Sequence, residues 1–349
     1  MKEATLYKKI DNTVECTACG RRCKLKPGQI GVCGVRKNLD GRLYLLVYGK
    51  AYAVNLDPIE KKPLYHFHPG SWVLSFGTTG CNFLCAYCCN YHMSQRRRVE
   101  GEDIPPDVMV SLAIEYNSDG LAYTYNEPTI FMEYAHDVGV QAKKKGLFNV
   151  FVTNGYMTEE AVEYLAKFLD AAAVDIKGNA NPEFMGKYAG VHDPQPIFDT
   201  LLMLKDKKIH VEITDLIVPE IGDRIEDAQK LMRWVYDNLG PDVPIHFIRF
   251  FPQYKLTNLP PTPVRTLEKH YKLAKEIGMK YVYLGNVPGH TYDNTYCPGC
   301  GKLLIARYGF SILEWHLKDG RCMFCGAEIN IKYSDDNAWR KSSRPWFIF

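Results

Sequence analysis

The chain has 349 residues, of which 46% are hydrophobic and 24% are charged, and its formal net charge is +3. This composition indicates a globular protein with a sizeable core and excludes disordered and fibrous proteins. The length exceeds that of an average domain, so we expect one large core with small appendages. Since phosphate binding needs a concentrated basic face, the low net charge does not by itself indicate a nucleic-acid partner, and RNA stays open as a partner.

The N-terminal residues include no apolar stretch of signal-peptide length, and no later stretch approaches the ~20 apolar residues of a membrane span. The sequence therefore predicts a cytoplasmic protein with no membrane partner. Twelve cysteines in such a protein are better candidates for metal ligands or catalysis than for disulfides. They fall into three groups, which divide the chain.

The first group has the spacing Cys16-x2-Cys19-x3-Cys23-x9-Cys33. Four thiolates can hold a zinc ion or an auxiliary iron–sulfur cluster, and this spacing leaves both open. An auxiliary cluster would imply an electron acceptor or a substrate anchor, whereas zinc would imply a structural cap. Apolar and polar residues then alternate over residues 42–56, which predicts a small hairpin or sheet attached to this group.

Strand and helix patterns alternate between the second and third groups, as in an α/β domain. We expect strands at about residues 72–76, 121–125, 149–153, 171–177, 210–219, 245–250 and 280–284. Spaced apolar residues predict helices at residues 129–145, 159–168, 194–207, 225–239 and 266–277. Helices of this kind pack outside a parallel sheet. The fold class is therefore α/β, with a partial (β/α)6 barrel of the TIM type.

The second group, Cys81-x3-Cys85-x2-Cys88, follows the first expected barrel strand. Barrels of this type carry their active sites at the carboxyl ends of the strands. Three thiolates can hold three irons of a 4Fe–4S cluster and leave the fourth iron open for a non-protein ligand. The alternative is a zinc loop, which needs a fourth ligand. Cys89 directly follows Cys88, and adjacent side chains seldom converge on one metal.

Polar residues also stand at the ends of four later strands: Tyr125, Asn126 and Glu127; Thr153 and Asn154; Asp175 and Lys177; and Arg249. Because the carboxyl ends of parallel strands form one rim, we expect these side chains to lie around a common site. A guanidinium at Arg249 could hold a carboxylate. The structural alternatives are an ordinary helix start after Glu127 and a buried ion pair between Asp175 and Lys177.

The third group forms two knuckles, Cys297-x2-Cys300 and Cys322-x2-Cys325, each followed by a glycine. This pattern predicts a zinc ribbon, in which the metal stabilises a segment too small to fold alone. A mononuclear iron held by four thiolates is the alternative. We divide the chain into an N-terminal four-cysteine and β segment, a barrel, a zinc-ribbon-like domain and a polar, then aromatic tail, at residues 1–71, 72–290, 291–333 and 334–349.

The cysteine loop resembles the radical S-adenosylmethionine (SAM) superfamily, whose signature C-x3-C-x-aromatic-C is met in full with Tyr87 at the aromatic position. The run from Tyr125 to Pro128 is similar to the Gly-Gly-Glu-Pro run that binds the amino group of SAM, with two glycines replaced. The residues at 153–155 and 175–177 match positions where pyruvate formate-lyase activating enzymes and their relatives contact the carboxylate and ribose of SAM.

Together with residues 57–67, 123–129 and 294–301, these motifs make nearly the whole chain similar to the AmmeMemoRadiSam radical SAM family, in the activating-enzyme-like branch. The resemblance implies a 4Fe–4S cluster at Cys81, Cys85 and Cys88, and SAM bound by the rim residues. It also implies reductive cleavage of SAM to a 5′-deoxyadenosyl radical, which abstracts hydrogen from a substrate, with electrons from a flavodoxin or ferredoxin.

Three hypotheses for the function stay open at this point. The substrate is a glycine of a partner protein, as for the activating enzymes, or it is a small metabolite, a peptide or RNA. The third hypothesis is a metal-binding scaffold without enzymatic activity. No residue is assigned as catalytic, because histidines placed like His66 and His68, beside an aromatic run, are more often structural.

Overall fold

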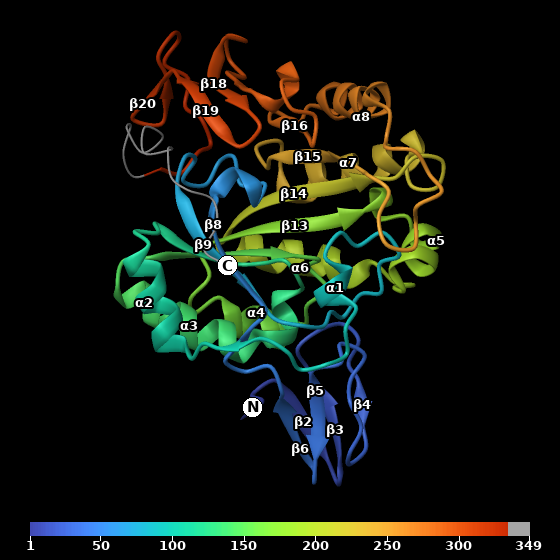
Figure 1. The fold of residues 1–349 in the computed structure, drawn as a ribbon. Helices are drawn as coiled ribbons and strands as arrows, with labels where there is room; N and C mark the ends of the chain where they lie inside the picture. Colours follow the sequence, from blue (N-terminus) through green and yellow to red (C-terminus); the bar gives the residue numbers. More distant parts are fainter. Residues whose placement is uncertain (334–349) are drawn as a thin grey trace.

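The computed structural model describes residues 1–333, and the expected tail at residues 334–349 lies outside the described residues. Figure 1 shows a β-rich N-terminal part at the bottom, a central sheet with helices, and a small C-terminal β part at the top. Across the described part of the chain, the helices are all too short or too polar to pass through a lipid bilayer.

The central sheet has the order β16-β15-β14-β13-β12-β11-β9-β8. Every neighbouring pair is parallel except β8 and β9. Its parallel strands are β9 (Trp72–Gly77), β11 (Gly120–Tyr123), β12 (Phe148–Thr153), β13 (Ala171–Lys177), β14 (His210–Ile217), β15 (Ile245–Arg249) and β16 (Val282–Gly285). The sequence expected each of them. The sheet stays open between β16 and β8, which confirms an α/β fold with a partial barrel.

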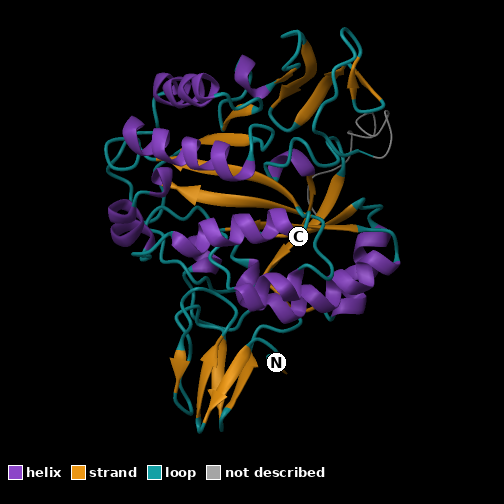
Figure 2. Ribbon diagram, turned by 180° about the vertical axis from the view of Figure 1, so that it is seen from behind, coloured by secondary structure: helices purple, strands orange, loops and turns teal. Residues whose placement is uncertain are grey.

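Helices lie along the outside of the sheet (Figure 2). They are α2 (Pro106–Glu115), α3 (Met132–Lys144), α4 (Glu159–Leu165), α6 (Gln195–Asp206), α7 (Ile225–Leu239) and α8 (Val264–Ile277), with the short turns α1 (Tyr91–Ser94) and α5 (Pro182–Phe184). The helix expected at residues 129–145 begins as a 3-10 turn, Pro128–Phe131. The sequence prediction omitted α2, whose Met109, Val110 and Ala113 are buried.

Short antiparallel sheets make up the N-terminal part. Their strands are β1 (Lys2–Glu3), β2 (Tyr7–Ile10), β3 (Thr13–Cys16), β4 (Lys24–Leu25), β5 (Arg36–Leu39), β6 (Arg42–Leu45), β7 (Lys50–Ala51) and β10 (Glu102–Asp103). The prediction of a small hairpin or sheet attached to the first cysteine group over residues 42–56 is wrong in its second half, because β8 (Ala53–Pro58) joins the central sheet beside β9. Val54 and Leu56 of β8 are buried there and cover the edge of an entirely buried strand.

The C-terminal part consists of β17 (Thr295–Tyr296), β18 (Leu303–Tyr308), β19 (Ser311–Trp315), β20 (Leu317–Lys318) and β21 (Arg321–Cys322). Its buried Leu304 and Ile305 share one hydrophobic cluster with Tyr281 and Tyr283 of the central unit. The ribbon therefore packs on the β16 edge of the sheet.

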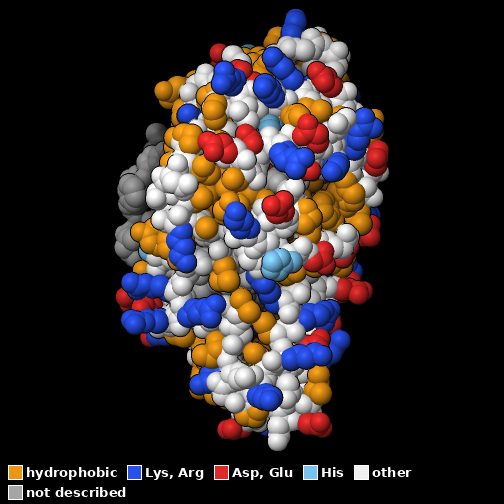
Figure 3. Space-filling view, turned by 90° about the vertical axis from the view of Figure 1, so that its right-hand side faces the viewer, with side chains coloured by type: hydrophobic (Ala, Val, Ile, Leu, Met, Phe, Trp, Pro, Cys, Tyr) orange, Lys and Arg blue, Asp and Glu red, His pale blue; other side chains and the backbone are white. Residues whose placement is uncertain are grey.

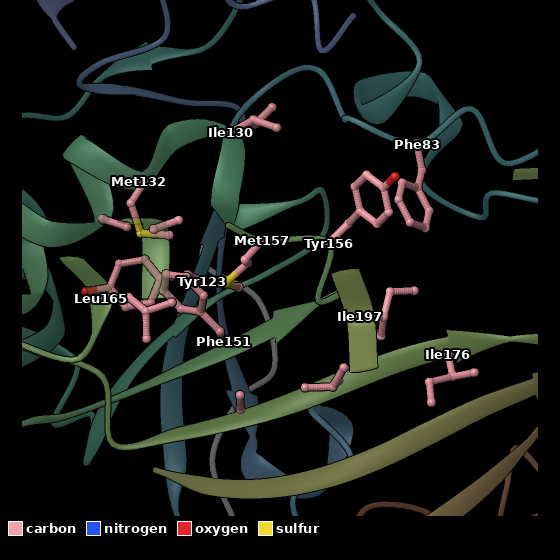
Figure 4. Close-up of a cluster of buried hydrophobic side chains, with 14 of the residues drawn as sticks. Phe83, Tyr123, Ile130, Met132, Phe151, Tyr156, Met157, Leu165, Ile176 and Ile197 are labelled. Carbon is pink, nitrogen blue, oxygen red and sulfur yellow. The ribbon is translucent and has the colours of Figure 1, made fainter. Parts of the chain in front are cut away.

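The main core lies between the sheet and the helices after β11 and β12, and Figure 4 shows part of it. Gly139 of α3 passes so close to Phe168 that a Cβ atom would lie 2.2 Å from the ring, so only glycine fits. Phe83 of the cysteine loop joins this core, with its ring 5.5 Å from that of Tyr156. The cysteine loop is thus anchored to the rigid centre of the protein.

Candidate active site

The cysteine loop begins at Gly77 and Gly80, where the backbone passes close to two other segments. A Cβ atom at Gly77 would lie 2.4 Å from the Thr124 carbonyl oxygen after β11. At Gly80, which has φ +92°, a Cβ atom would lie 2.4 Å from the Cys33 carbonyl oxygen. Both glycines are therefore required by packing, and the loop is wedged between the end of β11 and the N-terminal cysteine group.

Burial shapes the protonation of the loop thiols. It raises the pKa of Cys85 to about 12, and the nearby Lys177 ammonium opposes that shift. The pKa of Cys81 is also raised, by burial and by the Glu127 carboxylate. Burial therefore disfavours free thiolates in the loop, and a metal bound there would have to displace the thiol protons.

Tyr125 has the conformation that a glycine would adopt with least strain, with φ +69°. Its hydroxyl donates to Asp57 Oδ2 at 2.6 Å, and Lys62 Nζ donates to the same oxygen at 2.6 Å. Asn90 Nδ2 donates to the Tyr125 carbonyl oxygen at 2.8 Å. These contacts hold the strained residue at the end of β11, at a position where the resemblance noted in the sequence predicts a glycine.

Asn126 is used to hold the cysteine loop. Its Oδ1 accepts from the Thr78 amide at 3.1 Å, and its Nδ2 donates to the Thr78 hydroxyl at 3.0 Å and to the Gly80 carbonyl oxygen at 2.9 Å. The side chain is buried. Asn126 therefore fixes the segment that leads into Cys81.

The buried Glu127 carboxylate joins the ends of β11 and β12. Its Oε1 accepts from the Thr129 amide at 3.0 Å, the Thr129 hydroxyl at 2.6 Å and the Thr153 hydroxyl at 2.6 Å. Its Oε2 accepts from the Asn154 amide at 2.7 Å. Burial raises the pKa of Glu127, and these hydrogen bonds oppose that shift. The carboxylate thus organises the rim, with Oε2 less occupied than Oε1.

Asn82, which the sequence analysis did not single out, connects the rim to the cysteine loop. Asn154 Nδ2 donates to Asn82 Oδ1 at 2.7 Å. Asn82 Nδ2 is buried and has no hydrogen-bond partner among residues 1–333. A buried donor of this kind is the place where an acceptor atom of a ligand would satisfy the structure. Its position directly after Cys81 was the one signal in the sequence.

The ends of β13 and β14 complete the rim beside the cysteine loop. Lys177 Nζ forms an ion pair with Asp175, whose Oδ1 accepts from the Thr214 hydroxyl at 2.9 Å. Burial lowers the pKa of Lys177, but Asp175 and the Cys85 sulfur reverse that effect and leave the pKa raised. Asp175 and Lys177 thus form the ion pair that the sequence analysis gave as the structural alternative. The Lys177 ammonium also interacts with the Cys85 sulfur of the cysteine loop.

Asp215 on β14 is a second residue that the sequence analysis missed. Its Oδ1 accepts from the Asn179 amide at 3.0 Å, whereas its buried Oδ2 has no partner in the described part of the chain. Burial raises the pKa of Asp215 to about 7. A charged residue within the apolar run of β14 was the available signal.

Arg249 at the end of β15 lies apart from this network. Its Nε donates to the Thr262 carbonyl oxygen at 2.8 Å, and its guanidinium stands 5.1 Å from the centre of the exposed Phe251 ring. The contacts recorded for it within residues 1–333 include none to the cysteine loop or to Glu127. The sequence analysis placed Arg249 with the other rim residues around a common site, and this placement stays a prediction.

The N-terminal cysteines line a small cavity at the base of the cysteine loop. Arg21 Nε donates to the Asn82 carbonyl oxygen at 3.0 Å, and its terminal nitrogen donates to the Gly190 carbonyl oxygen at 2.6 Å. The cavity is lined by Cys16, Ala18, Cys19, Arg21, Cys23, Leu25, Gly31, Val32, Cys33, Arg36, Asn82 and Ile130.

The C-terminal cysteines form a tight quartet. The sulfur atoms of Cys297 and Cys325 are 3.6 Å apart, those of Cys300 and Cys322 are 3.8 Å apart, and all four lie within 4.8 Å of one another. A tetrahedral zinc site with Zn–S bonds of about 2.3 Å requires sulfur separations of about 3.8 Å. The quartet can therefore hold a single metal ion of that size.

A parallel α/β sheet, with a three-cysteine loop and a buried polar rim at its carboxyl edge, defines a class of metal-dependent barrel enzymes. The family model of the radical SAM superfamily matches residues 76–235, from β9 into α7. The chain belongs to the radical SAM superfamily, and its domain implies a 4Fe–4S cluster and SAM as cofactors.

One relative extends over almost the whole chain. "Uncharacterized protein MJ0808" of Methanocaldococcus jannaschii is 45% identical over 336 residues, which are 95% of this chain and 99% of that protein. The two chains therefore belong to one family along nearly their whole length.

Solved structures resemble this chain at low sequence identity. A radical SAM methyltransferase from Sphaerobacter thermophilus has a TM-score of 0.50 at 14% identity, over 68% of this chain and 71% of its own. A domain of pyruvate-formate lyase-activating enzyme from Bacteroides vulgatus has a TM-score of 0.42 at 11% identity, over 48% of this chain and 100% of its own. The first likeness supports the fold and no finer property.

Proposed function

We propose that Cys81, Cys85 and Cys88 hold the 4Fe–4S cluster of this radical SAM enzyme, and that SAM lies on the rim formed by the strand ends. The observation that supports this most is the cysteine loop itself, fixed by Asn126 at its start and followed by the unpartnered donor of Asn82. The buried thiols and this free donor fit a sulfur cluster and a polar cofactor.

The bound cluster and SAM supply the chemistry, which is one-electron cleavage of a C–S bond to a 5′-deoxyadenosyl radical that abstracts hydrogen. The chain supplies the positions of the reacting groups. Glu127 holds the ends of β11 and β12 at a fixed separation through its hydrogen bonds. We assign Tyr125, Asn126, Glu127, Thr153 and Asn154, with Asp175, Lys177 and Arg249, to the SAM-binding rim. Lys177 adds a positive charge beside Cys85.

The proposed substrate is a glycine of a partner protein, as for the glycyl-radical activating enzymes. The similarity of the strand-end motifs to that branch supports it. The proposal includes a cytoplasmic location, a flavodoxin-type or ferredoxin-type electron donor and a zinc ion in the C-terminal quartet, whose sulfur spacing suits zinc. Figure 3 shows acidic, basic and apolar side chains interspersed on one face, without a concentrated basic patch on it.

The radical SAM assignment is tested by following SAM cleavage in the anaerobic, reduced protein. Replacing Cys81, Cys85 or Cys88 by Ala should abolish 5′-deoxyadenosine formation, because each change removes one of three cluster ligands. Cys89→Ala is the matched control, since Cys89 is an exposed neighbour outside the three-ligand set, and it should keep most of the activity. Wild-type turnover in a Cys81→Ala variant would refute the assignment.

The substrate is tested separately. Incubation with SAM, reductant and a glycyl-radical enzyme from the same cell should produce the doublet electron-spin signal of a backbone glycyl radical. Transfer of deuterium from labelled glycine into 5′-deoxyadenosine should accompany it. If this signal is absent while 5′-deoxyadenosine formation rises with a small metabolite, a peptide or RNA, the glycine proposal is wrong.

A further inference from the structure

Cys16, Cys19, Cys23 and Cys33 line one pocket together with apolar side chains such as Leu25. Four thiolates around one zinc ion lie about 3.8 Å apart, whereas the irons and sulfides of a 4Fe–4S cluster hold its four thiolates further apart. The separation of the sulfur atoms therefore distinguishes a single ion from a polynuclear group.

The C-terminal quartet provides an internal comparison. Within residues 1–333, it is the one set of three or more cysteine, histidine or carboxylate ligand atoms that all lie within 4.8 Å of one another. The N-terminal sulfurs are more widely spaced than this set. Gly31 lies between two of them, because a Cβ atom there would lie 3.7 Å from Cys23 Sγ and 3.8 Å from Cys33 Sγ.

Groups on the cavity wall suit an anionic sulfur cluster. Arg36 is fully buried and lines the cavity, with its guanidinium paired to Glu133 at 2.5 Å and 3.1 Å. Arg21 lines it too and carries no carboxylate partner among the contacts recorded for residues 1–333. Asn82 also lines the cavity, so the cavity adjoins the residue that directly follows Cys81.

We propose that Cys16, Cys19, Cys23 and Cys33 ligate a second 4Fe–4S cluster in this cavity. Four thiolates occupy all four irons, so this cluster carries electrons and does not bind substrate. Its position beside the cysteine loop rests on the packing of Gly80 against the Cys33 carbonyl oxygen and on the Arg21 to Asn82 hydrogen bond.

The position of the cavity indicates the direction of electron flow. Cys23 is partly exposed, whereas Cys33 is buried against the loop, so the site lies between solvent and the loop. None of its lining residues comes from β14 or from β13, the strand that carries the rim residues Asp175 and Lys177. One electron from a flavodoxin or ferredoxin would reduce the second cluster. The same electron would then pass to the cluster that the cysteine loop holds. This role rests on the proposed function, whereas cluster binding does not.

Iron and sulfide counts in the full-length, anaerobically reconstituted protein test the site. Wild type should hold about eight irons and the Cys81→Ala/Cys85→Ala/Cys88→Ala variant about four, in a signal that SAM does not perturb. Adding Cys16→Ala and Cys33→Ala should remove the rest. Iron-free protein with about two zinc ions per chain in the triple variant would overturn the proposal. If wild type and the triple variant both hold about four irons per chain, the assignment of a cluster to Cys81, Cys85 and Cys88 is wrong instead.

A folding control and a kinetic readout complete the experiment. Cys23→Ser replaces the most accessible ligand, and zinc in the C-terminal quartet with an unchanged circular dichroism spectrum would show that the variant is folded. Reduced flavodoxin should bleach the loop cluster of the Cys16→Ala/Cys33→Ala variant at least tenfold more slowly than that of wild type, while titanium(III) citrate should bleach both equally. Equal rates with flavodoxin would refute the relay role.

Discussion

Asn154 at the end of β12 donates a hydrogen bond from Nδ2 to Oδ1 of Asn82 at 2.7 Å, across 72 residues of sequence. Both side chains are buried. Asn154 Oδ1 also accepts from the Tyr156 amide at 3.0 Å, which fixes the orientation of the amide. Through this bond, the third strand of the parallel sheet positions the residue that directly follows Cys81.

Replacing either asparagine by alanine should therefore lower the free energy of unfolding by nearly the same amount. Asn82→Ala and Asn154→Ala should each lower the free energy of unfolding by about 1–3 kcal/mol, because each leaves a buried polar partner unsatisfied. The double variant should lose clearly less than the sum of the two. Urea unfolding and SAM binding check this, with the exposed Asn258→Ala as control. Strict additivity would show that the two residues act independently.

The buried ion pair between Arg36 and Glu133 gives a second prediction. Arg36→Met leaves the Glu133 carboxylate buried without its charged partner, and this should lower stability by about 3–5 kcal/mol. Arg36→Met combined with Glu133→Gln should recover most of the loss, because the amide can still accept the hydrogen bonds from the Leu6 and Thr5 amides.

Thermal and urea unfolding measure both effects. The exposed pair of Arg42 and Glu3 is the matched control, and Arg42→Met should change stability by no more than about 0.5 kcal/mol. A comparable loss in Arg36→Met and Arg42→Met would contradict the prediction.

The C-terminal quartet gives a third prediction. Cys322→Ala should hold about one zinc ion fewer per chain at unchanged iron content, since three thiolates no longer close a structural site. The melting temperature should fall, because zinc binding contributes folding free energy to a segment with a small core. Metal analysis and scanning calorimetry check this against Cys89→Ala. A loss of iron in Cys322→Ala would show that the quartet holds a redox metal.

His66 makes the stability of the protein sensitive to acid. Burial lowers its pKa from 6.5 to about 4, although the Glu212 carboxylate nearby opposes the shift. Its Nδ1 donates to the Asn330 carbonyl oxygen at 2.6 Å, and its Nε2 lies 2.6 Å from the Tyr283 hydroxyl oxygen. The ring thus joins the central unit to the ribbon in its neutral form.

Between pH 6.5 and pH 4, His66 binds more protons in the unfolded state than in the folded state. The contribution of His66 to the free energy of unfolding is therefore complete above pH 6.5 and is lost as the pH falls towards 4. The difference amounts to at most about 3 kcal/mol. His66→Gln should therefore flatten the fall in stability between pH 7 and pH 5, whereas the exposed His192→Gln should not. Parallel stability curves for wild type and His66→Gln would disprove this.

The sequence by itself determined the local patterns. Cysteine spacing indicated three groups of metal ligands because thiolates a few residues apart can reach one site. Alternating strand and helix patterns placed all seven parallel strands, because buried strands of such a sheet read as short apolar runs. The helix α2 was overlooked, although its Met109 and Val110 are buried.

Only the tertiary structure decided which distant segments share the site. Tyr125 keeps a glycine-like φ because Asp57, 68 residues earlier, accepts the hydrogen bond of its hydroxyl, and Asn82 becomes important through Asn154. The N-terminal cysteines meet the loop through the close approach of Gly80 to Cys33. These contacts join residues far apart in sequence, so no local period or spacing encodes them. They form when packing of the sheet and the N-terminal part brings the segments together.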